Sequence, residues 1–204
     1  MASPSRIRKS MTLEEFLKLP DEKPSLEHID GRVEAKVSPQ KKQSRLRVGL
    51  SDFLDRFAEP EGLGLTFVEL RCTFAGRSIV PDVVFLLSEH IGCDEEGELV
   101  NETLIPPDIH VEIISPGQAA GRAQERLAHS TSHGCSLGWV IHPEKKRIDV
   151  YRPGRLPERL SADGVLEGEP VLPGFRLPVA EVFGWLKPWG PGLIAPPDPG
   201  ADPA

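Results

Sequence analysis

Two apolar segments near the middle of the chain each contain a single acidic residue. Asp82 lies within Ile79–Leu87, which has the sequence IVPDVVFLL. Glu112 lies within Ile109–Ile114, which has the sequence IHVEII. Nearly continuous apolar runs of this length are typical of strands that are buried on both faces of a sheet. We therefore expect a buried sheet with two carboxyl groups in its interior.

The N-terminal part of the chain carries two local structure signals. Thr12 and Glu15 have the spacing of a capping box, which predicts a short helix that begins next to Met11. Asp30-Gly31 separates two short alternating runs between residues 26 and 37, and this dipeptide favours the tight turn of a β-hairpin. These signals predict a helix followed by a two-stranded antiparallel unit.

The remaining segments complete an α/β (α+β) domain, with a mixed sheet flanked by helices and additional antiparallel hairpins. Apolar residues at helical spacing indicate a helix over 40–57, and a second helix over 121–133 ends at Gly134. Further strands are predicted at 65–70, 137–142 and 147–151. Helices that alternate with strands in this order favour one sheet with helices packed on it.

The distribution of Gly and Pro divides the chain into three parts. The chain of 204 residues contains 19 Gly and 21 Pro, and nine of these fall in the last 18 residues. Such a segment cannot form a helix or a strand ladder, so 187–204 is predicted to be a disordered tail. Residues 1–10 carry basic residues and no acid, and are predicted to be a flexible basic arm. One domain is expected over 11–186.

Cysteine content and apolar runs bear on the cellular compartment. Cys72, Cys93 and Cys135 are odd in number and form no CxxC pair, which argues against a disulfide framework or a zinc site. The chain has no apolar run of membrane-spanning length and no signal-peptide core at its start. We expect a reduced cytoplasmic protein without a membrane partner.

The acidic residues in the predicted strands suggest a metal site. Asp82 and Glu112 would join Glu27, which lies in the first short strand. A buried carboxylate must be paired, protonated or metal-bound. Three carboxylates at one end of a sheet are hard oxygen ligands suited to Mg²⁺ or Mn²⁺. The alternative is a structural domain in which these acids form salt bridges.

Several short motifs resemble a known family. Pro81-Asp82 followed by an acid in a later strand is the pattern of PD-(D/E)xK nucleases, although Ile114 stands where that motif has lysine. The motifs LEHIDG, PDVVFL, HVEIISP and GCSLGWVIHP, in this order, closely resemble the Uma2 family, also called DUF820. The resemblance covers about residues 11–186 and implies a restriction-endonuclease-like fold in which the lysine has moved onto a helix.

The resemblance also implies a set of site residues. Glu27, Asp82 and Glu112 correspond to the acidic residues of the family, and the main-chain carbonyl of Ile113 would be a further metal ligand. The position of the moved lysine is taken by Arg126. Arginine can clamp a phosphate but cannot act as a base at ordinary pH.

Two further positions depart from the family. Gln118 and Ser130 stand where an acid and a tyrosine are common. Together with Arg126, these departures leave two readings open. One is a weakened nuclease, and the other is an inactive member that binds DNA or protein.

A basic segment suggests how DNA would be held. The stretch 36–47 carries positive charges and no acid, although the whole chain has a net charge of −7. Its five cations are Lys36, Lys41, Lys42, Arg45 and Arg47. They would contact a phosphate backbone, or else form a solvated helix face.

Two other side-chain patterns carry less weight. His129 and His133 have metal-ligand spacing, but Ser130 replaces the Glu of an HExxH motif, and a pair of ordinary histidines is the simpler interpretation. Cys135 has no evident partner that would activate its thiol.

The expected function is Mg²⁺-dependent (or Mn²⁺-dependent) DNA endonuclease activity. In this hypothesis Glu27, Asp82 and Glu112 hold the metal ion, and Arg126 stabilises the developing charge. The alternative is a catalytically inactive nuclease-fold protein that binds DNA or another protein. A homodimer is compatible with either reading.

Overall fold

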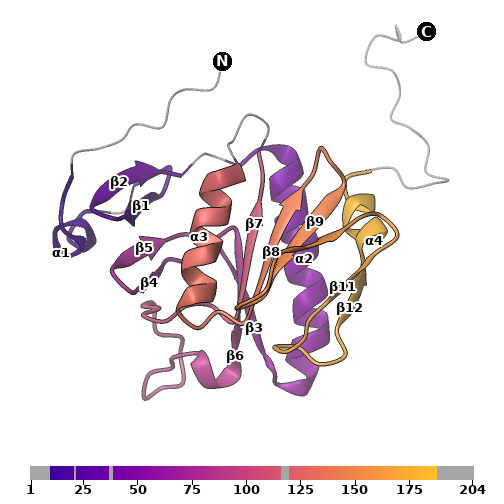
Figure 1. Cartoon of the computed structure of the whole chain (residues 1–204). Helices are drawn as coiled ribbons and strands as arrows, with labels where there is room; N and C mark the ends of the chain where they lie inside the picture. Colours follow the sequence, from indigo (N-terminus) through magenta and orange to yellow (C-terminus); the bar gives the residue numbers. More distant parts are fainter. Residues whose placement is uncertain (1–9, 21, 37–38, 116–119, 188–204) are drawn as a thin grey trace, which may run out of the picture.

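The computed structural model describes residues 10–20, 22–36, 39–115 and 120–187. A six-stranded mixed sheet lies at its centre, with the strand order β10-β9-β8-β7-β6-β3 (Figure 1). Its strands are β3 (Gly64–Val68), β6 (Val83–Leu87), β7 (Ile109–Ile113), β8 (Leu137–His142), β9 (Arg147–Tyr151) and β10 (Glu158–Leu160). Strands β7 and β8 are parallel, and the other neighbouring pairs are antiparallel. The predicted mixed α/β (α+β) architecture is confirmed.

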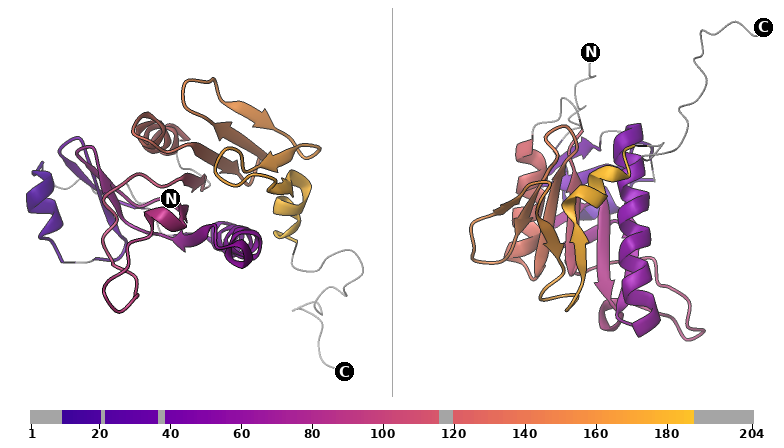
Figure 2. Two further views of the ribbon diagram at one scale, coloured as in Figure 1. Left: turned by 90° about the horizontal axis from the view of Figure 1, so that it is seen from below. Right: turned by 90° about the vertical axis from the view of Figure 1, so that its right-hand side faces the viewer.

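Two helices cover opposite faces of the central sheet (Figure 2). Helix α2 (Lys41–Ala58) buries Leu46, Leu50 and Leu54 completely in the main core. Full burial of such side chains contributes roughly 1.5–3 kcal/mol each. Helix α3 (Ala120–Ser132) forms the crossover between the parallel strands β7 and β8, as parallel pairing requires. This arrangement places α3 directly over the strand that carries Glu112.

Glycine at position 138 allows α3 to approach the sheet closely. A Cβ atom at Gly138 in β8 would lie 2.6 Å from Leu127 of α3. Leu127 is fully buried at this contact. The close approach brings side chains from the inner face of α3 down to the level of β7.

A second, smaller sheet stands beside the first, with the order β2-β1-β5-β4. Its strands are β1 (Leu26–Ile29), β2 (Arg32–Ala35), β4 (Cys72–Phe74) and β5 (Arg77–Ile79). The predicted hairpin turn joins β1 to β2, and both Asp30 and Gly31 have positive φ angles, of 49° and 78°. The capping box of Thr12 and Glu15 is also present, at the start of helix α1 (Leu13–Leu17).

The prediction of one continuous strand over Ile79–Leu87 was wrong. The segment is divided between β5 of the small sheet and β6 of the central sheet. Pro81 has no N–H group to donate to a strand ladder, which favours a break at this point. Asp82 therefore lies at the junction of the two sheets, and its N–H donates to the carbonyl of Val111 at 3.1 Å.

The C-terminal part adds elements for which the sequence analysis gave no residue ranges. Strands β11 (Val165–Glu167) and β12 (Arg176–Pro178) form a hairpin, and helix α4 (Val179–Gly184) packs against α2. Two 3₁₀ turns span Glu59–Glu61 and Ser88–His90. The helix predicted at 121–133 is α3, and Gly134 follows it with a φ of 120°.

Nearly all of the two predicted terminal segments, the basic arm and the Pro/Gly-rich tail, lies outside the described residues. Within the described part of the chain, no helix has the length and apolar character needed to cross a membrane. The three cysteines are free thiols.

Candidate functional site

The three acidic residues singled out in the sequence meet at the junction of the two sheets. Glu27 comes from β1, Asp82 precedes β6, and Glu112 lies in β7. Three cations share the site, and all six residues are at most 9% exposed. The cations are Lys36 after β2, Arg47 of α2 and Arg126 of α3. Three negative and three positive charges thus form one buried cluster, which satisfies the requirement that buried charges be paired.

Arg126 links two of the acids. Its Nε and one terminal nitrogen donate to the two oxygens of Glu112 at 2.8 and 2.7 Å, and the other terminal nitrogen donates to Glu27 at 3.2 Å. The bidentate geometry with Glu112 is the strongest arrangement that a guanidinium forms with a carboxylate. Arg126 therefore joins β1, β7 and α3 through charged hydrogen bonds.

Asp82 is held by a different set of donors. Its Oδ1 atom accepts from Lys36 at 2.9 Å and also from Arg47, while Oδ2 accepts from the N–H of Ile113 at 2.7 Å. Lys36 also donates to the carbonyl of Val80 at 2.5 Å. The carboxylate is thus fixed next to the strand that carries Glu112.

The two acids bound by Arg126 are shifted in opposite directions. Burial alone would raise the pKa of the Glu112 carboxyl, but the charge and hydrogen bonds of Arg126, helped by His110, hold that pKa well below its usual range. Burial raises the pKa of Glu27, against a weaker lowering by Arg126. Opposed shifts in neighbouring acids are a feature of sites that perform acid–base chemistry.

His110 and Ser130 complete the surroundings of Glu112, and the sequence interpretation missed the histidine. His110 Nε2 lies 3.0 Å from Glu112 Oε1, and its Nδ1 lies 2.7 Å from Ser130 Oγ. Alternate residues of a strand lie on the same face, so the spacing of His110 and Glu112 was a usable signal. Both His110 and Ser130 are fully buried, so they position Glu112 and cannot meet a substrate from solvent.

Gln43 was also missed. Its side-chain amide donates to the carbonyl of Ile113 at 2.6 Å, and Gln43 is buried. It lies one helical turn before Leu46 on the apolar face of α2, a position at which a polar residue is informative. The carbonyl that the sequence interpretation assigned as a metal ligand already has this partner.

The donor groups suit a divalent cation in their chemistry. Two carboxylates and a carbonyl, from Asp82, Glu112 and Ile113, are the hard oxygen ligands that Mg²⁺ and Mn²⁺ prefer. In this arrangement each of these oxygens accepts a hydrogen bond from a cation, an amide or His110. Among the described residues, no three His, Cys, Asp or Glu side chains are grouped so that they could hold a metal ion. The side chains as they stand therefore do not form a metal site, and Asp82, Glu112 and the Ile113 carbonyl are all occupied by protein donors.

The five cations of the basic segment divide into two groups. Lys36 and Arg47 are buried in the acid cluster, as described above. Lys41, Lys42 and Arg45 are exposed on the first turns of α2. Lys42 pairs with Glu144 at 2.6 Å. Only the second group presents its charges to solvent.

The competing patterns have structural roles. His129 stacks on Phe74 with ring centroids 4.9 Å apart, and His133 bonds through Nδ1 to the carbonyl of His129 at 2.7 Å. Burial raises the pKa of Cys135 to about 12, so its thiol is protonated at neutral pH. A protonated thiol is a poor nucleophile.

Comparison with known proteins agrees with the motifs. No curated protein matched the chain. A solved structure, described as a putative nuclease belonging to DUF820 from Anabaena variabilis ATCC 29413, is 34% identical with a TM-score of 0.83. The alignment covers 86% of this chain and 99% of that chain. Residues 13–180 match the model of the family Uma2, which is described as a putative restriction endonuclease. The chain, with its acid cluster at the junction of two sheets, belongs to the Uma2 family.

Proposed function

We propose that this protein is a DNA endonuclease that hydrolyses phosphodiester bonds at the buried acid cluster with the help of Mg²⁺ or Mn²⁺. The observation that carries the proposal is the convergence of Glu27 from β1, Glu112 from β7 and Asp82 from the segment before β6. Membership of a family that is described as a putative restriction endonuclease supports the same reaction class.

Each residue of the cluster has a role in this proposal. Asp82, Glu112 and the carbonyl of Ile113 would hold the divalent cation, with Glu27 beside them. When bound, such a cation polarises a phosphoryl oxygen and lowers the pKa of a coordinated water. His110 keeps Glu112 in its orientation.

The proton and charge chemistry would be divided between two side chains. Arg126 stays protonated at any working pH and would stabilise negative charge on the phosphate. It cannot act as a base. Burial raises the pKa of Glu27, so the carboxyl of Glu27 is the group in the cluster suited to exchange a proton.

The exposed cations of α2 would hold the DNA backbone. Lys41 and Arg45 are four residues apart and lie on one face of the helix. Their contacts would be independent of DNA sequence and sensitive to salt. Neutralising both is expected to weaken DNA binding uniformly and to reduce its salt dependence by about two counterions.

Nicking of supercoiled plasmid DNA tests the proposal. The wild type is expected to produce open circles with Mg²⁺ or Mn²⁺ and none with a chelator. Asp82→Asn removes one charged ligand and is expected to abolish nicking. Asp52→Asn is the matched control, because Asp52 is exposed on α2 and pairs only with Arg56 among the described residues. Equal nicking by the wild type and Asp82→Asn would reject the site.

A second function, DNA binding without cleavage, is favoured by Arg126. The arginine takes the place of the family lysine and occupies both oxygens of Glu112. This reading predicts no nicking with either cation and salt-dependent retention of DNA. Gain of cleavage in Arg126→Lys would identify a weakened nuclease. The homodimer remains a prediction that sedimentation would check.

A further inference from the structure

One surface segment of the protein carries a large share of the exposed apolar side chains. It is the segment 91–107, which joins the 3₁₀ turn Ser88–His90 to β7 and lies beside β4 at the lower edge of Figure 1. Eight large apolar side chains of the described residues are exposed, and four of them belong to this segment. These four are Leu99, Val100, Leu104 and Ile105. Exposed apolar residues that gather at one place among polar residues mark interaction sites of soluble proteins.

The segment is tied to the rest of the molecule through its main chain. The N–H of Val100 donates to the carbonyl of Gly92 at 2.9 Å, which closes a small hairpin within the segment. The carbonyl of Thr103 accepts from the N–H of Thr73 in β4 at 2.9 Å. A surface that is held in place before binding loses less conformational entropy when a partner docks on it.

Five acidic side chains lie in the same segment, and all five are exposed. They are Asp94, Glu95, Glu96, Glu98 and Glu102. The sequence between Arg77 and Arg122 contains no lysine or arginine, so the segment has no such cation of its own. None of the five acids forms an ion pair with a residue that the structure describes. The apolar side chains are therefore accompanied by unbalanced negative charge.

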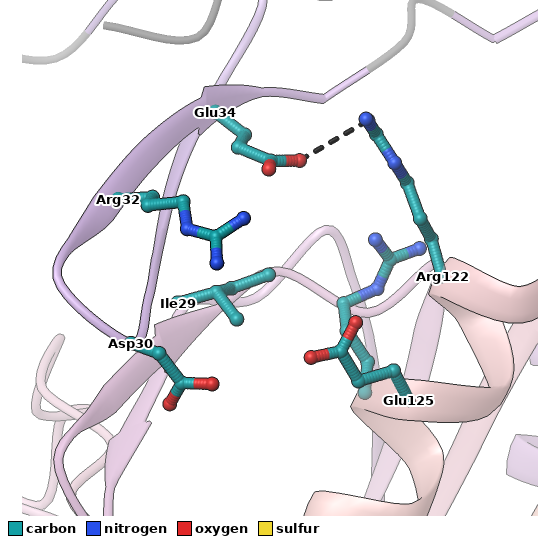
Figure 3. A pocket seen from close by; sticks show the side chains of 7 residues that line it. Ile29, Asp30, Arg32, Glu34, Arg122 and Glu125 are labelled. Atoms are coloured by element: carbon teal, nitrogen blue, oxygen red, sulfur yellow. Dashed lines mark ion pairs between the residues drawn. The ribbon is translucent and has the colours of Figure 1, made fainter. Parts of the chain in front are cut away.

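Acids elsewhere on the surface often have a cation at hand. The cavity between the β1–β2 hairpin and α3, which Arg126 also borders, is an example (Figure 3). There Glu34 pairs with Arg122 at 3.1 Å, as the dashed line marks. The segment 91–107 lacks such pairing, so its negative potential is available to a partner of opposite charge.

The position of the segment and its charge decide what kind of partner fits. Asp82 precedes β6 and the segment follows that strand, so the length of a five-residue strand, about 17 Å, separates the segment from the acid cluster. Its acids repel a phosphate backbone, so DNA does not cover this surface. Two copies of the chain that met through it about a two-fold axis would bring their acids together. The partner must carry cations as well as apolar side chains.

We propose that the segment 91–107 docks a protein partner through a basic segment of that partner which also carries apolar side chains. The four exposed apolar residues pack against the partner's apolar side chains, and the acids pair with its lysines or arginines. Apolar burial supplies most of the affinity, and charge complementarity selects the partner and speeds its association. The inference is independent of the proposed nuclease reaction, because this surface and the acid cluster share no residue.

A synthetic amphipathic peptide of leucine and lysine tests the proposal on the full chain. Cys93 lies within the segment and is exposed, so the rate at which Ellman's reagent modifies Cys93 reports on this surface. The peptide is expected to bind in a calorimetric titration and to slow the modification. Two comparison peptides, with serine for leucine or glutamate for lysine, should each bind about 10-fold or more weakly. No binding of the leucine–lysine peptide, or equal binding of the serine–lysine peptide, would overturn the proposal.

Apolar variants test the patch itself. Leu99→Ser combined with Leu104→Ser is expected to weaken peptide binding by about 10-fold or more. Leu156→Ser is the matched control, because Leu156 is 93% exposed and lies outside the segment. All three leucines are exposed, so both proteins should fold as the wild type does. Equal binding by the double variant and the control would show that the peptide does not use this surface.

Charge variants test the selection of a basic partner. Glu98→Gln combined with Glu102→Gln should weaken peptide binding by about 3-fold at low salt, and by less at high salt, where exposed charges are screened. Glu59→Gln combined with Glu61→Gln removes the same charge from exposed positions outside the segment and should match the wild type. Equal affinities of the two double variants would reject the electrostatic half of the proposal.

Two other occupants of the surface give different results. Sedimentation of the chain alone tests a second copy, and flotation with phosphatidylcholine or phosphatidylglycerol vesicles tests a membrane. We expect neither self-association nor vesicle binding that depends on Leu99 and Leu104. Either result would assign the surface to that occupant and overturn the proposal.

Discussion

Lys36 and Asp82 form an ion pair of 2.9 Å in which both side chains are almost completely buried. The ammonium group also donates to the carbonyl of Val80, which precedes Asp82 by two residues. A buried pair differs from a surface pair, because loss of one partner leaves a desolvated charge behind. Lys36 is therefore a member of the acid cluster rather than part of a solvated helix face.

Lys36→Met is expected to lower the free energy of unfolding by about 1–3 kcal/mol, because Asp82 keeps Arg47 but loses its second cation. Urea unfolding measures the change. Lys18→Met is the matched control, since Lys18 forms a lysine–carboxylate pair of 2.7 Å with Glu14 at an exposed position. The control should change stability by no more than about 0.5 kcal/mol. Equal effects of the two substitutions would mean that burial of the pair is unimportant.

Gly49 of α2 lies against the ring of Trp185. A Cβ atom at this position would lie 2.6 Å from the indole. Alanine favours helix formation by about 1 kcal/mol over glycine, but overpacking costs about 1–3 kcal/mol. Gly49→Ala is therefore expected to lower the melting temperature.

Gly121→Ala in α3 is the opposite case, because a Cβ atom there has no neighbour within 4 Å among the described residues. It should raise stability by a few tenths of a kcal/mol up to about 1 kcal/mol. Thermal unfolding of both variants measures whether the melting temperature falls for Gly49→Ala and rises for Gly121→Ala. A rise in melting temperature for Gly49→Ala would contradict the packing of Trp185 against α2.

His90 is expected to make stability depend on pH. Its hydrogen bond to Asp108, at 2.9 Å, raises the pKa of His90 above the ordinary value of 6.5. A pKa that is higher in the folded state stabilises the protein fully below about pH 6.5. This contribution is lost as the pH rises through the folded-state pKa. His90→Gln should make the free energy of unfolding depend less on pH in that range. An NMR titration that gives His90 an ordinary pKa would refute the prediction.

The three cysteines should differ in reactivity. Burial raises the pKa of Cys72 and of Cys135 to about 12, whereas Cys93 is exposed. Because the thiolate is the reactive form, only Cys93 should react with Ellman's reagent in the native protein at neutral pH. All three should react in denaturant. Native reactivity that survives Cys93→Ser would show that a buried thiol is accessible.

The local elements could be predicted from the sequence because their causes are local. The capping box of Thr12 and Glu15 and the turn at Asp30-Gly31 depend on residues a few positions apart. The apolar spacing that predicted α2 is likewise a pattern among residues three or four positions apart. The continuous strand over Ile79–Leu87 failed because apolar content cannot reveal that Pro81 marks a passage between two sheets.

The acids of the candidate site were also predictable, since a single carboxylate in an apolar run demands an explanation. Their partners were not. Arg126 and Glu27 are 99 positions apart in the chain and lie 3.2 Å apart in the structure. Nothing in the spacing of Lys36 and Arg47 distinguishes them from the exposed Lys41 and Arg45.

The sequence by itself therefore determined helices α1, α2 and α3, most of the strands and the identity of the buried acids, because these follow from periodicity and from the cost of burying charge. Only the tertiary structure decided which cation neutralises which acid, and that Arg126 borders both the acid cluster and a cavity. Charge pairing acts through space at a few ångströms, and the packing of α2 and α3 on the sheet sets those distances.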